Sequence, residues 1–376
     1  MVPPEYVNRR RLADTFIGLI QIDSPSFREQ AIGERLRVEL ERAGCAVEKQ
    51  EYDRSFNLVG RRKGTSAGAL PLLVCAHMDT IEPTEGIEFS EVDGMIRSTG
   101  KTVLGADDKS ALAQILEALS VIHERDLPLG DLEIVFTSAE ERGLFGSKNL
   151  DFSRLRSRHA LVLDACAEMG SLIVSAPTHV TYEMRVTGRP AHAGIEPEAG
   201  INAIRVAALI VASLPDGRIS EQTTANIGEI RGGTATNVVP QQVVLRGEFR
   251  SRSGPELEAL REEIFGSARS IAAAHGAEIE ITPTEDYRAF TIPEDDPFLQ
   301  FLCGVFRKCG KAPLLVPTGG GSDANIFNGK GITAVNMANG MRRVHSSDEH
   351  ISVDDLNEGC RLLLQAVTDF RGFEER

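Results

Sequence analysis

One short stretch of the chain constrains the fold more than any other: an apolar run, Leu70 to Ala76, that ends in His77-Met78-Asp79. A continuous apolar run of this length is typical of a strand that is buried on both faces of a parallel sheet. In open α/β sheets, ligands and catalytic groups gather where strands reach their carboxyl ends. His77 and Asp79 therefore stand where chemistry is expected, although an isolated pair of this kind is more often a buried histidine beside an acid.

The same pattern recurs along the chain, where further acids and a histidine follow expected strands or open a helix. These are Asp107-Asp108 before a helix expected from Ser110, Glu140-Glu141 after the strand 132–137, Asp164 after the strand 160–163, and His345 after the strand 333–337. Acids at a helix start or on a loop are commonplace, but an Asp that ends an apolar strand is costly unless it is paired or coordinated. Mixed histidine and carboxylate ligands suit zinc or another divalent transition ion. A carboxylate shared by two ions would make a two-metal hydrolytic site.

The order of the expected elements predicts two domains. Helices and strands alternate over residues 1–176, which predicts an α/β domain with a mostly parallel sheet flanked by helices. Residues 177–285 change to the order β-α-β-β-α-β of a split βαβ, ferredoxin-like α+β domain. The α/β style returns over 286–376, so we expect one α/β domain interrupted by an inserted domain.

Composition limits the class of partner and the compartment. The chain has 376 residues and a formal net charge of −14, which argues against nucleic acid and anionic membrane surfaces as partners. No apolar run approaches the length of a membrane span, and Met1 to Glu5 do not begin a secretion signal. The six cysteines are scattered, without a Cys-x-x-Cys pair, which indicates free thiols in a reducing cytoplasm. Metal ligands would therefore be histidines and carboxylates.

Together these motifs resemble the co-catalytic zinc exopeptidase family that includes peptidase T, dipeptidase V, aminoacylase and succinyl-diaminopimelate desuccinylase. The resemblance runs over essentially the whole chain and includes the inserted segments 188–194 and 232–240. The segments Glu140 to Gly146 and Thr318 to Asn325 are most similar to the peptidase T-like subgroup. A zinc exopeptidase-like α/β fold with an inserted dimerisation and lid domain is therefore expected.

The resemblance implies a role for each member of the pattern. Asp107 would bridge two zinc ions, for which cobalt or manganese are possible substitutes. The other implied ligands are His77 and Asp164 for one ion, and Glu141 and His345 for the second. Glu140 would be the general base, and Asp79 would orient His77. A cis peptide bond between Asp107 and Asp108 is also implied.

The resemblance also implies contacts to the substrate. His192 would stabilise the developing oxyanion, and Asn237 and Arg250 would contact the substrate, with Arg250 suited to a terminal carboxylate. The glycine loop that contains Gly320 and leads to Ser322 would allow close backbone approach to a ligand. Taken alone, His192 is a loop histidine, Asn237 a turn residue, Arg250 one member of a charged strand, and the glycine loop an ordinary turn.

The sequence thus predicts a cytoplasmic, zinc-dependent metallopeptidase of short peptides, a tripeptidase or aminopeptidase, that forms a homodimer through the inserted domain. An alternative keeps the site but takes N-acyl amino acids or related amides. A metal-dependent phosphoesterase is a different class, disfavoured by the negative net charge and by the lack of a Lys or Arg cluster around the motifs. The complete set of motifs argues against a non-catalytic relative. Ser110-Ala111 and Arg142 depart from the residues frequent in the family, which bears on fine specificity.

Overall fold

The computed structural model describes residues 2–374, which form two compact units. The first unit consists of the residues up to Val174, of Thr291–Pro317 and of the residues from Ser322 on. The second unit consists of Ser175–Phe290 and Thr318–Gly321. Within residues 2–374, every helix is too short or too polar to span a bilayer.

The first unit is built on a nine-stranded sheet in the order β1-β2-β6-β3-β7-β16-β8-β14, with β15 paired to β8. Its strands are β1 Ala46–Tyr52, β2 Ser55–Arg62, β3 Leu72–His77, β6 Leu132–Thr137, β7 His159–Ala165, β8 Ser171–Ala176, β14 Phe290–Thr291, β15 Leu314–Pro317 and β16 Thr333–Ala338. β6, β3, β7 and β16 are parallel neighbours in the middle of the sheet, whereas β1 and β2 add antiparallel strands at one edge. β3 and β6 are buried throughout, as apolar central strands of a parallel sheet should be.

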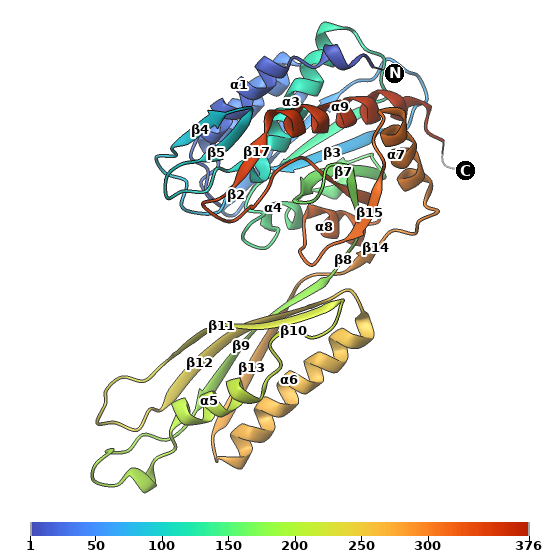
Figure 1. Ribbon diagram of the computed structural model, residues 1–376. Helices are drawn as coiled ribbons and strands as arrows, with labels where there is room; N and C mark the ends of the chain where they lie inside the picture. The colour runs from blue at the N-terminus through green and yellow to red at the C-terminus, as the bar shows by residue number, and fades with distance from the viewer. Residues whose placement is uncertain (1, 375–376) are drawn as a thin grey trace. The chain divides into compact units, whose positions relative to one another are not determined.

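Helices cover both faces of this sheet. They are α1 Arg9–Ile20, α2 Gln30–Arg42, α3 Ala106–Glu124, α4 Phe145–Lys148, α7 Pro297–Lys308, α8 Asp323–Gly329 and α9 Val353–Asp369, with short 3-10 turns at Pro4–Tyr6, Phe152–Arg154 and Phe370–Gly372. α3 packs on β3 and β7 and contacts α1 and α9, while α8 packs on β7, β16 and α4 (Figure 1). α3 is buried almost all round, and its buried residues include the polar Lys109, Gln114 and Glu117 as well as apolar ones. A small sheet of β4 Phe89–Val92, β5 Met95–Ser98 and β17 His350–Ser352 completes the unit.

The second unit is an antiparallel sheet with two helices on one face (Figure 1). Its elements are β9 Thr178–Thr187, a 3-10 turn at Pro197–Ala199, α5 Ala203–Ser213, β10 Gly217–Arg218, β11 Thr223–Gly232, β12 Gln242–Ser251, α6 Gly254–Ala274 and β13 Glu278–Tyr287. The strand order is β10-β11-β12-β9-β13. Alternate residues of β9, among them Val180 and Met184, point into a core that α5 and α6 close with Ile210 and Ile264. The fold class predicted from the sequence, an α/β domain with an inserted α+β domain, is confirmed.

Removing the aromatic side chain of Phe249 from the core of the second unit should destabilise that unit selectively. Phe249 is fully buried and packs against Tyr182 and Phe265. We expect Phe249→Ala to lower the free energy of unfolding of this unit by about 3–5 kcal/mol, measured by urea denaturation followed by circular dichroism. Glu262→Ala, on the exposed face of α6, should change it by less than about 0.5 kcal/mol. Equal shifts for both variants would contradict this account of the core.

Candidate metal centre

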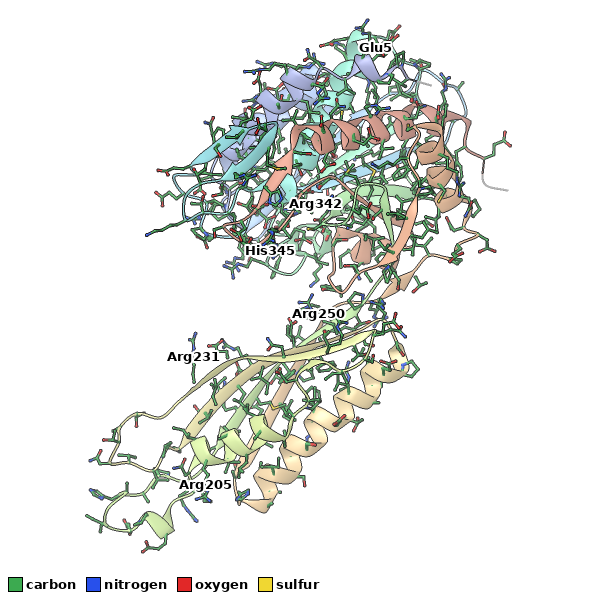
Figure 2. All side chains as sticks on the ribbon, in the orientation of Figure 1. Glu5, Arg205, Arg231, Arg250, Arg342 and His345 are labelled. Carbon is green, nitrogen blue, oxygen red and sulfur yellow. The ribbon has the colours of Figure 1, made fainter. Side chains whose placement is uncertain are left out.

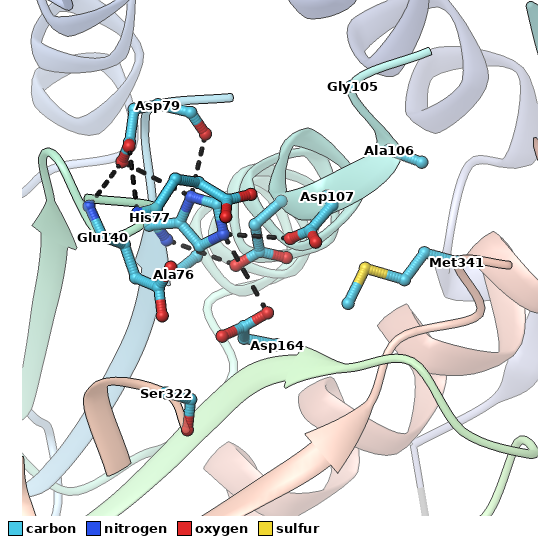
Figure 3. A network of polar contacts seen from close by, with 12 residues as sticks. Ala76, His77, Asp79, Gly105, Ala106, Asp107, Glu140, Asp164, Ser322 and Met341 are labelled. Carbon is cyan, nitrogen blue, oxygen red and sulfur yellow. Dashed lines mark hydrogen bonds and ion pairs between the residues drawn. The ribbon is translucent and has the colours of Figure 1, made fainter. Parts of the chain in front are cut away.

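The loops at the carboxyl ends of the central strands bring the predicted acids and histidines together. Figure 3 shows His77, Asp79, Asp107, Glu140 and Asp164 of this set. Donor atoms lie within 4.8 Å of one another in three groups: His77, Asp107 and Asp164; His77, Glu140 and Glu141; and Asp107, Glu141 and His345. All five predicted metal ligands therefore belong to one cluster, together with the predicted general base. The cluster forms because neighbouring parallel strands present their carboxyl ends at the same edge of the sheet.

His77 presents one ring nitrogen to two carboxylates. Its Nδ1 lies 2.8 Å from the main-chain oxygen of Asp79 and must donate, because a carbonyl oxygen only accepts. Nε2 faces Asp107 Oδ1 at 2.9 Å and Asp164 Oδ1 at 3.9 Å. In the neutral ring this nitrogen carries a lone pair, which two carboxylates would repel. A cation held between the three side chains removes that conflict.

A second group shares a member with the first. His345 Nε2 lies 3.0 Å from Glu141 Oε1 and 3.3 Å from Asp107 Oδ2. Asp107 thus turns one oxygen toward His77 and the other toward His345. Imidazole nitrogens and carboxylate oxygens are the donors that zinc and similar ions take, so the residues present fit such a metal.

The cluster concentrates negative charge away from water. Burial raises the pKa of Glu140 and of Asp164 well above the usual range, and neighbouring carboxylates raise both further. Burial is also the main cause of the raised pKa of Glu141. Burial acts on Asp107 in the same direction, but hydrogen bonds with the two histidines hold its pKa below the usual range. Hydrogen bonds with Asp107 and Glu141 raise the pKa of His345 to about 10.

Asp79 connects the two halves of the cluster. Its carboxylate accepts the main-chain N–H groups of Glu140 at 2.9 Å and Glu141 at 3.2 Å, and the hydroxyl of Ser26 at 2.7 Å. The carboxylate lies farther from His77 Nδ1, at 3.6 Å, than the main-chain oxygen does. Asp79 therefore faces His77 with its carbonyl and holds the loop of Glu140 with its side chain.

The turn at Asp107 is held by two residues that the sequence analysis missed. The Asp107–Asp108 bond is cis, as the resemblance implies. Glu349 accepts the N–H groups of Gly105 at 2.7 Å and of Asp107 at 2.9 Å. Asn339 donates to the Asp108 carboxylate at 2.8 Å and to the main chain of β7 at 2.7 Å. The only sign of Asn339 in the sequence is an amide directly after an apolar strand.

The second unit brings His192 and Asn237 together. The loop of His192 pairs with that of Asn237, since the N–H of Ala193 donates to the Asn237 carbonyl at 3.0 Å. Both residues are exposed. Nδ1 of His192 accepts the N–H of Gly194 at 3.1 Å, which leaves Nε2 for another partner.

Arg250 lies at the opposite end of the same sheet from His192. Arg250, near the end of β12, pairs with His179, near the start of β9. Thr187, the last residue of β9 and the one nearest the His192 loop in the chain, pairs with Gln242 at the start of β12. Figure 2 shows Arg250 at one end of the sheet and Arg205, at the start of α5, toward the other. The guanidinium binds Glu248 through Nε at 3.1 Å and Nη2 at 3.0 Å. His179 also contacts Glu248, at 2.8 Å.

The predicted glycine loop has internal structural contacts. The N–H of Gly320 donates to the Thr318 hydroxyl at 3.1 Å. Gly321 lies so close to the ring of Tyr287 that a Cβ would stand 2.2 Å from it, so this position requires glycine. The buried Ser322 hydroxyl caps α8 and accepts from Asn336 at 3.2 Å. Ser322 therefore already has side-chain partners in the fold, as do the predicted substrate contacts Arg250 and His192.

An α/β sheet with helices on both faces and this cluster at its strand ends defines a metal-dependent hydrolase as a class. The model of peptidase family M20/M25/M40 matches residues 73–369, and the chain belongs to this family. The Bacillus subtilis protein YqjE is 34% identical over 368 residues, which cover 96% of this chain and 99% of YqjE. The aminopeptidase PepT of Bacillus cereus superposes with a TM-score of 0.87 at 34% identity, covering 97% of this chain and 99% of that one. A tripeptidase of Staphylococcus aureus superposes with a TM-score of 0.92 at 32% identity, covering 98% of this chain and 100% of that one. The protein is a hydrolase of peptide bonds of the peptidase T-like kind.

Asp79→Asn should weaken metal binding without unfolding the protein. An amide has one acceptor oxygen where the carboxylate has two, so the N–H of Glu140 or of Glu141 would face an NH₂ group. We expect the affinity for zinc to fall by about 10–100-fold, measured by competition with a chromophoric chelator. Ser26→Ala, which removes a single contact to Asp79, should have a smaller effect. Unchanged affinity in Asp79→Asn would show that this carboxylate does not support the centre.

Proposed function

We propose that the protein hydrolyses short peptides from the amino-terminal end. We also propose that it uses two divalent metal ions for this reaction and that these are zinc ions. The observation that carries the proposal is the position of Asp107, which offers one oxygen to each of two groups of candidate ligands. A shared carboxylate of this kind is the basis of two-metal hydrolytic sites. The similarity to an aminopeptidase and a tripeptidase supports short peptides as substrates.

Each ligand has a defined place in this proposal. Asp107 would hold both ions. The other ligands are His77 and Asp164 for one ion, and Glu141 and His345 for the other. When bound, two such ions would polarise a substrate carbonyl and lower the pKa of a water molecule. Asp79 keeps the ring of His77 in the tautomer that leaves Nε2 for the metal.

Glu140 is the proposed general base. Its carboxyl group is buried beside the proposed ligands, and its main chain is fixed by Asp79. A carboxyl group whose pKa is raised by burial can take a proton from water and later give it to the departing amine. Glu141, next in the chain, is the metal ligand, so the two acids divide binding and proton transfer between them.

Arg250 is the proposed partner of the substrate's terminal carboxylate. Glu248 engages Nε and Nη2 of the guanidinium, and Nη1 lies 3.4 Å from the Tyr287 hydroxyl. One N–H on Nη1 and one on Nη2 remain along the outer edge, which is a suitable pair for a second carboxylate. Glu248 thus holds the guanidinium in one orientation without using this edge.

His192 and Arg250 can serve one short peptide only if they come from different copies of the chain. They lie at opposite ends of strands of ten residues, which span roughly 30 Å, whereas an extended tripeptide spans about 10 Å. We therefore propose a homodimer in which His192, with Asn237 beside it, completes the site of the partner. Such an exchange fits the oxyanion-stabilising role expected for His192.

The edge of the second unit offers a surface for this dimer. Within residues 2–374, β11 pairs on its outer side only with the two-residue β10, so its stretch from Asn226 on has an open edge. Ile230 on β11 and Ile204 and Leu209 on α5 are exposed apolar side chains. Open edges and exposed apolar residues are typical of protein interfaces.

The six cysteines are all free, which supports a cytoplasmic location.

Glu140→Ala should abolish turnover while the metal stays bound. Loss of a general base costs about 10²–10⁴-fold in kcat, and Glu140 is not one of the proposed ligands. The measurement is hydrolysis of di- and tripeptides and of N-acyl amino acids, with metal content determined on the same samples. Glu85→Ala, at an exposed acid, is the matched control and should behave as wild type. Near-normal turnover in Glu140→Ala would refute the assignment, and preference for N-acyl amino acids would change the substrate class.

Mixing two inactive variants should restore activity if the dimer exchanges His192. His192→Ala and Glu140→Ala should each be inactive alone. After dissociation and reassociation at equal amounts, half of the dimers combine the two variants and carry one intact site, so about a quarter of wild-type activity should return. No recovery, with dimers confirmed by light scattering, would mean that His192 serves its own chain or none.

A further inference from the structure

A small cavity lies beside the candidate metal centre in the first unit. Its volume is about 220 Å³, and it is lined by Ser26, Thr80, Ile81, Glu82, Glu141 and Arg142. The lining comes from three loops, which follow α1, β3 and β6. Pockets that take drug-sized molecules measure about 300–1,000 Å³, so this cavity has room for one amino-acid side chain rather than for a nucleotide or an organic cofactor.

The wall of the cavity and the metal centre are fixed by the same carboxylate. Glu141 belongs to both, and its main-chain N–H donates to Asp79 Oδ2 at 3.2 Å. The hydroxyl of Ser26, which also lines the cavity, donates to the same oxygen at 2.7 Å. When the carbonyl carbon of the bond to be cleaved lies at the centre, next to Glu141, the residue that carries this carbonyl can reach the cavity with its side chain. In a peptide cleaved from its amino-terminal end, that residue is the first one.

Apart from Glu141, which belongs to the candidate metal centre, the charged groups at the cavity are the carboxylate of Glu82 and the guanidinium groups of Arg142 and Arg28. Glu82 Oε1 accepts from Arg28 Nη2 at 2.8 Å. Arg142 Nη2 lies 3.8 Å from Glu82 Oε2, which is beyond hydrogen-bond range, so the guanidinium donors of Arg142 remain available for a ligand. Two guanidinium groups thus share one carboxylate. Among the lining residues, Glu82 is the one acid outside the candidate metal centre, and it is already paired with Arg28.

We propose that this cavity binds the side chain of the substrate's amino-terminal residue and that Arg142 makes it selective for a carboxylate, as in Glu or Asp. The assignment rests on the proposed peptidase function and names its substrate class. Arg142 acts on specificity by direct contact with the substrate side chain. Its guanidinium group is largely exposed, with 64% of the side chain accessible, so the attraction is moderate and is screened by salt.

The test compares three tripeptides that differ only in the first residue: Glu-Ala-Ala, Gln-Ala-Ala and Lys-Ala-Ala. Glutamate and glutamine have nearly the same shape, so their ratio of kcat/KM isolates the effect of charge. At low ionic strength the wild-type enzyme should favour Glu over Gln by about three- to tenfold, and the ratio should fall as salt is added. Arg142→Ala should bring the ratio to about one, and Arg142→Glu should favour Lys.

Two further variants separate the assignment from general charge effects. Arg10→Ala removes a positive charge on α1, where Arg10 pairs with Asp14 at 3.0 Å, and should leave the ratio unchanged. Glu82→Gln removes the carboxylate that competes for the two guanidinium groups and should increase the preference for Glu. Calorimetric titration of the same peptides into the Glu140→Ala variant should show the preference as a difference in Kd.

The outcomes distinguish this assignment from the proposed function. Hydrolysis of all three peptides with a Glu to Gln ratio that Arg142→Ala does not change overturns the assignment alone. Loss of hydrolysis of every peptide in Glu82→Gln would also overturn it, because Glu82 would then hold the substrate's ammonium group. Failure of the metal-loaded wild-type enzyme to cleave any of the three peptides overturns the peptidase proposal and the assignment with it.

Discussion

The structure of the centre depends on one constraint: several carboxylates lie close together, largely out of contact with water. Each unpaired buried charge is costly, and like charges at short distance raise that cost. The carboxylate of Asp107 takes the central position because each of its oxygens faces one histidine. Burial and repulsion by neighbouring carboxylates raise the pKa of Glu140 and of Asp164, which lie around it. An arrangement of this kind is stable as a receptor for cations.

Rigid support for the cluster comes from polar side chains that bind main-chain groups. Asp79 fixes the loop after β6, and Glu349 fixes the turn before α3. Asn339, at the end of β16, ties Asp108 to β7. The order of the central strands, β6-β3-β7-β16, is therefore also the order in which functional side chains follow one another along the sheet edge. Hydrogen bonds to the main chain fix the position of a loop more firmly than contacts between side chains, since they restrict the backbone itself.

Much of this site could be predicted because it depends on local patterns. Apolar runs predict buried strands, and polar residues at their ends mark the sheet edge, which suffices to find His77 and Asp164. Glu349 could not be found in this way, because it acts on Gly105, which lies 244 positions away in the chain. The pairing of His179 with Glu248 depends on strand register, which the sequence does not reveal. For the same reason the three short strands of the small sheet were not expected.

The path of the chain has a consequence for its synthesis. β7, which ends at Ala165, has β16 as its parallel neighbour, and β16 begins only at Thr333, after the whole second unit has been made. The second unit, by contrast, consists almost entirely of the contiguous residues Ser175–Phe290. Domains fold as units while the chain emerges from the ribosome, so the inserted unit can fold while the central sheet of the first is still incomplete. The candidate ligand group of Asp107, Glu141 and His345 is complete only once His345 has been added, so this part of the candidate centre forms late in the synthesis of the chain.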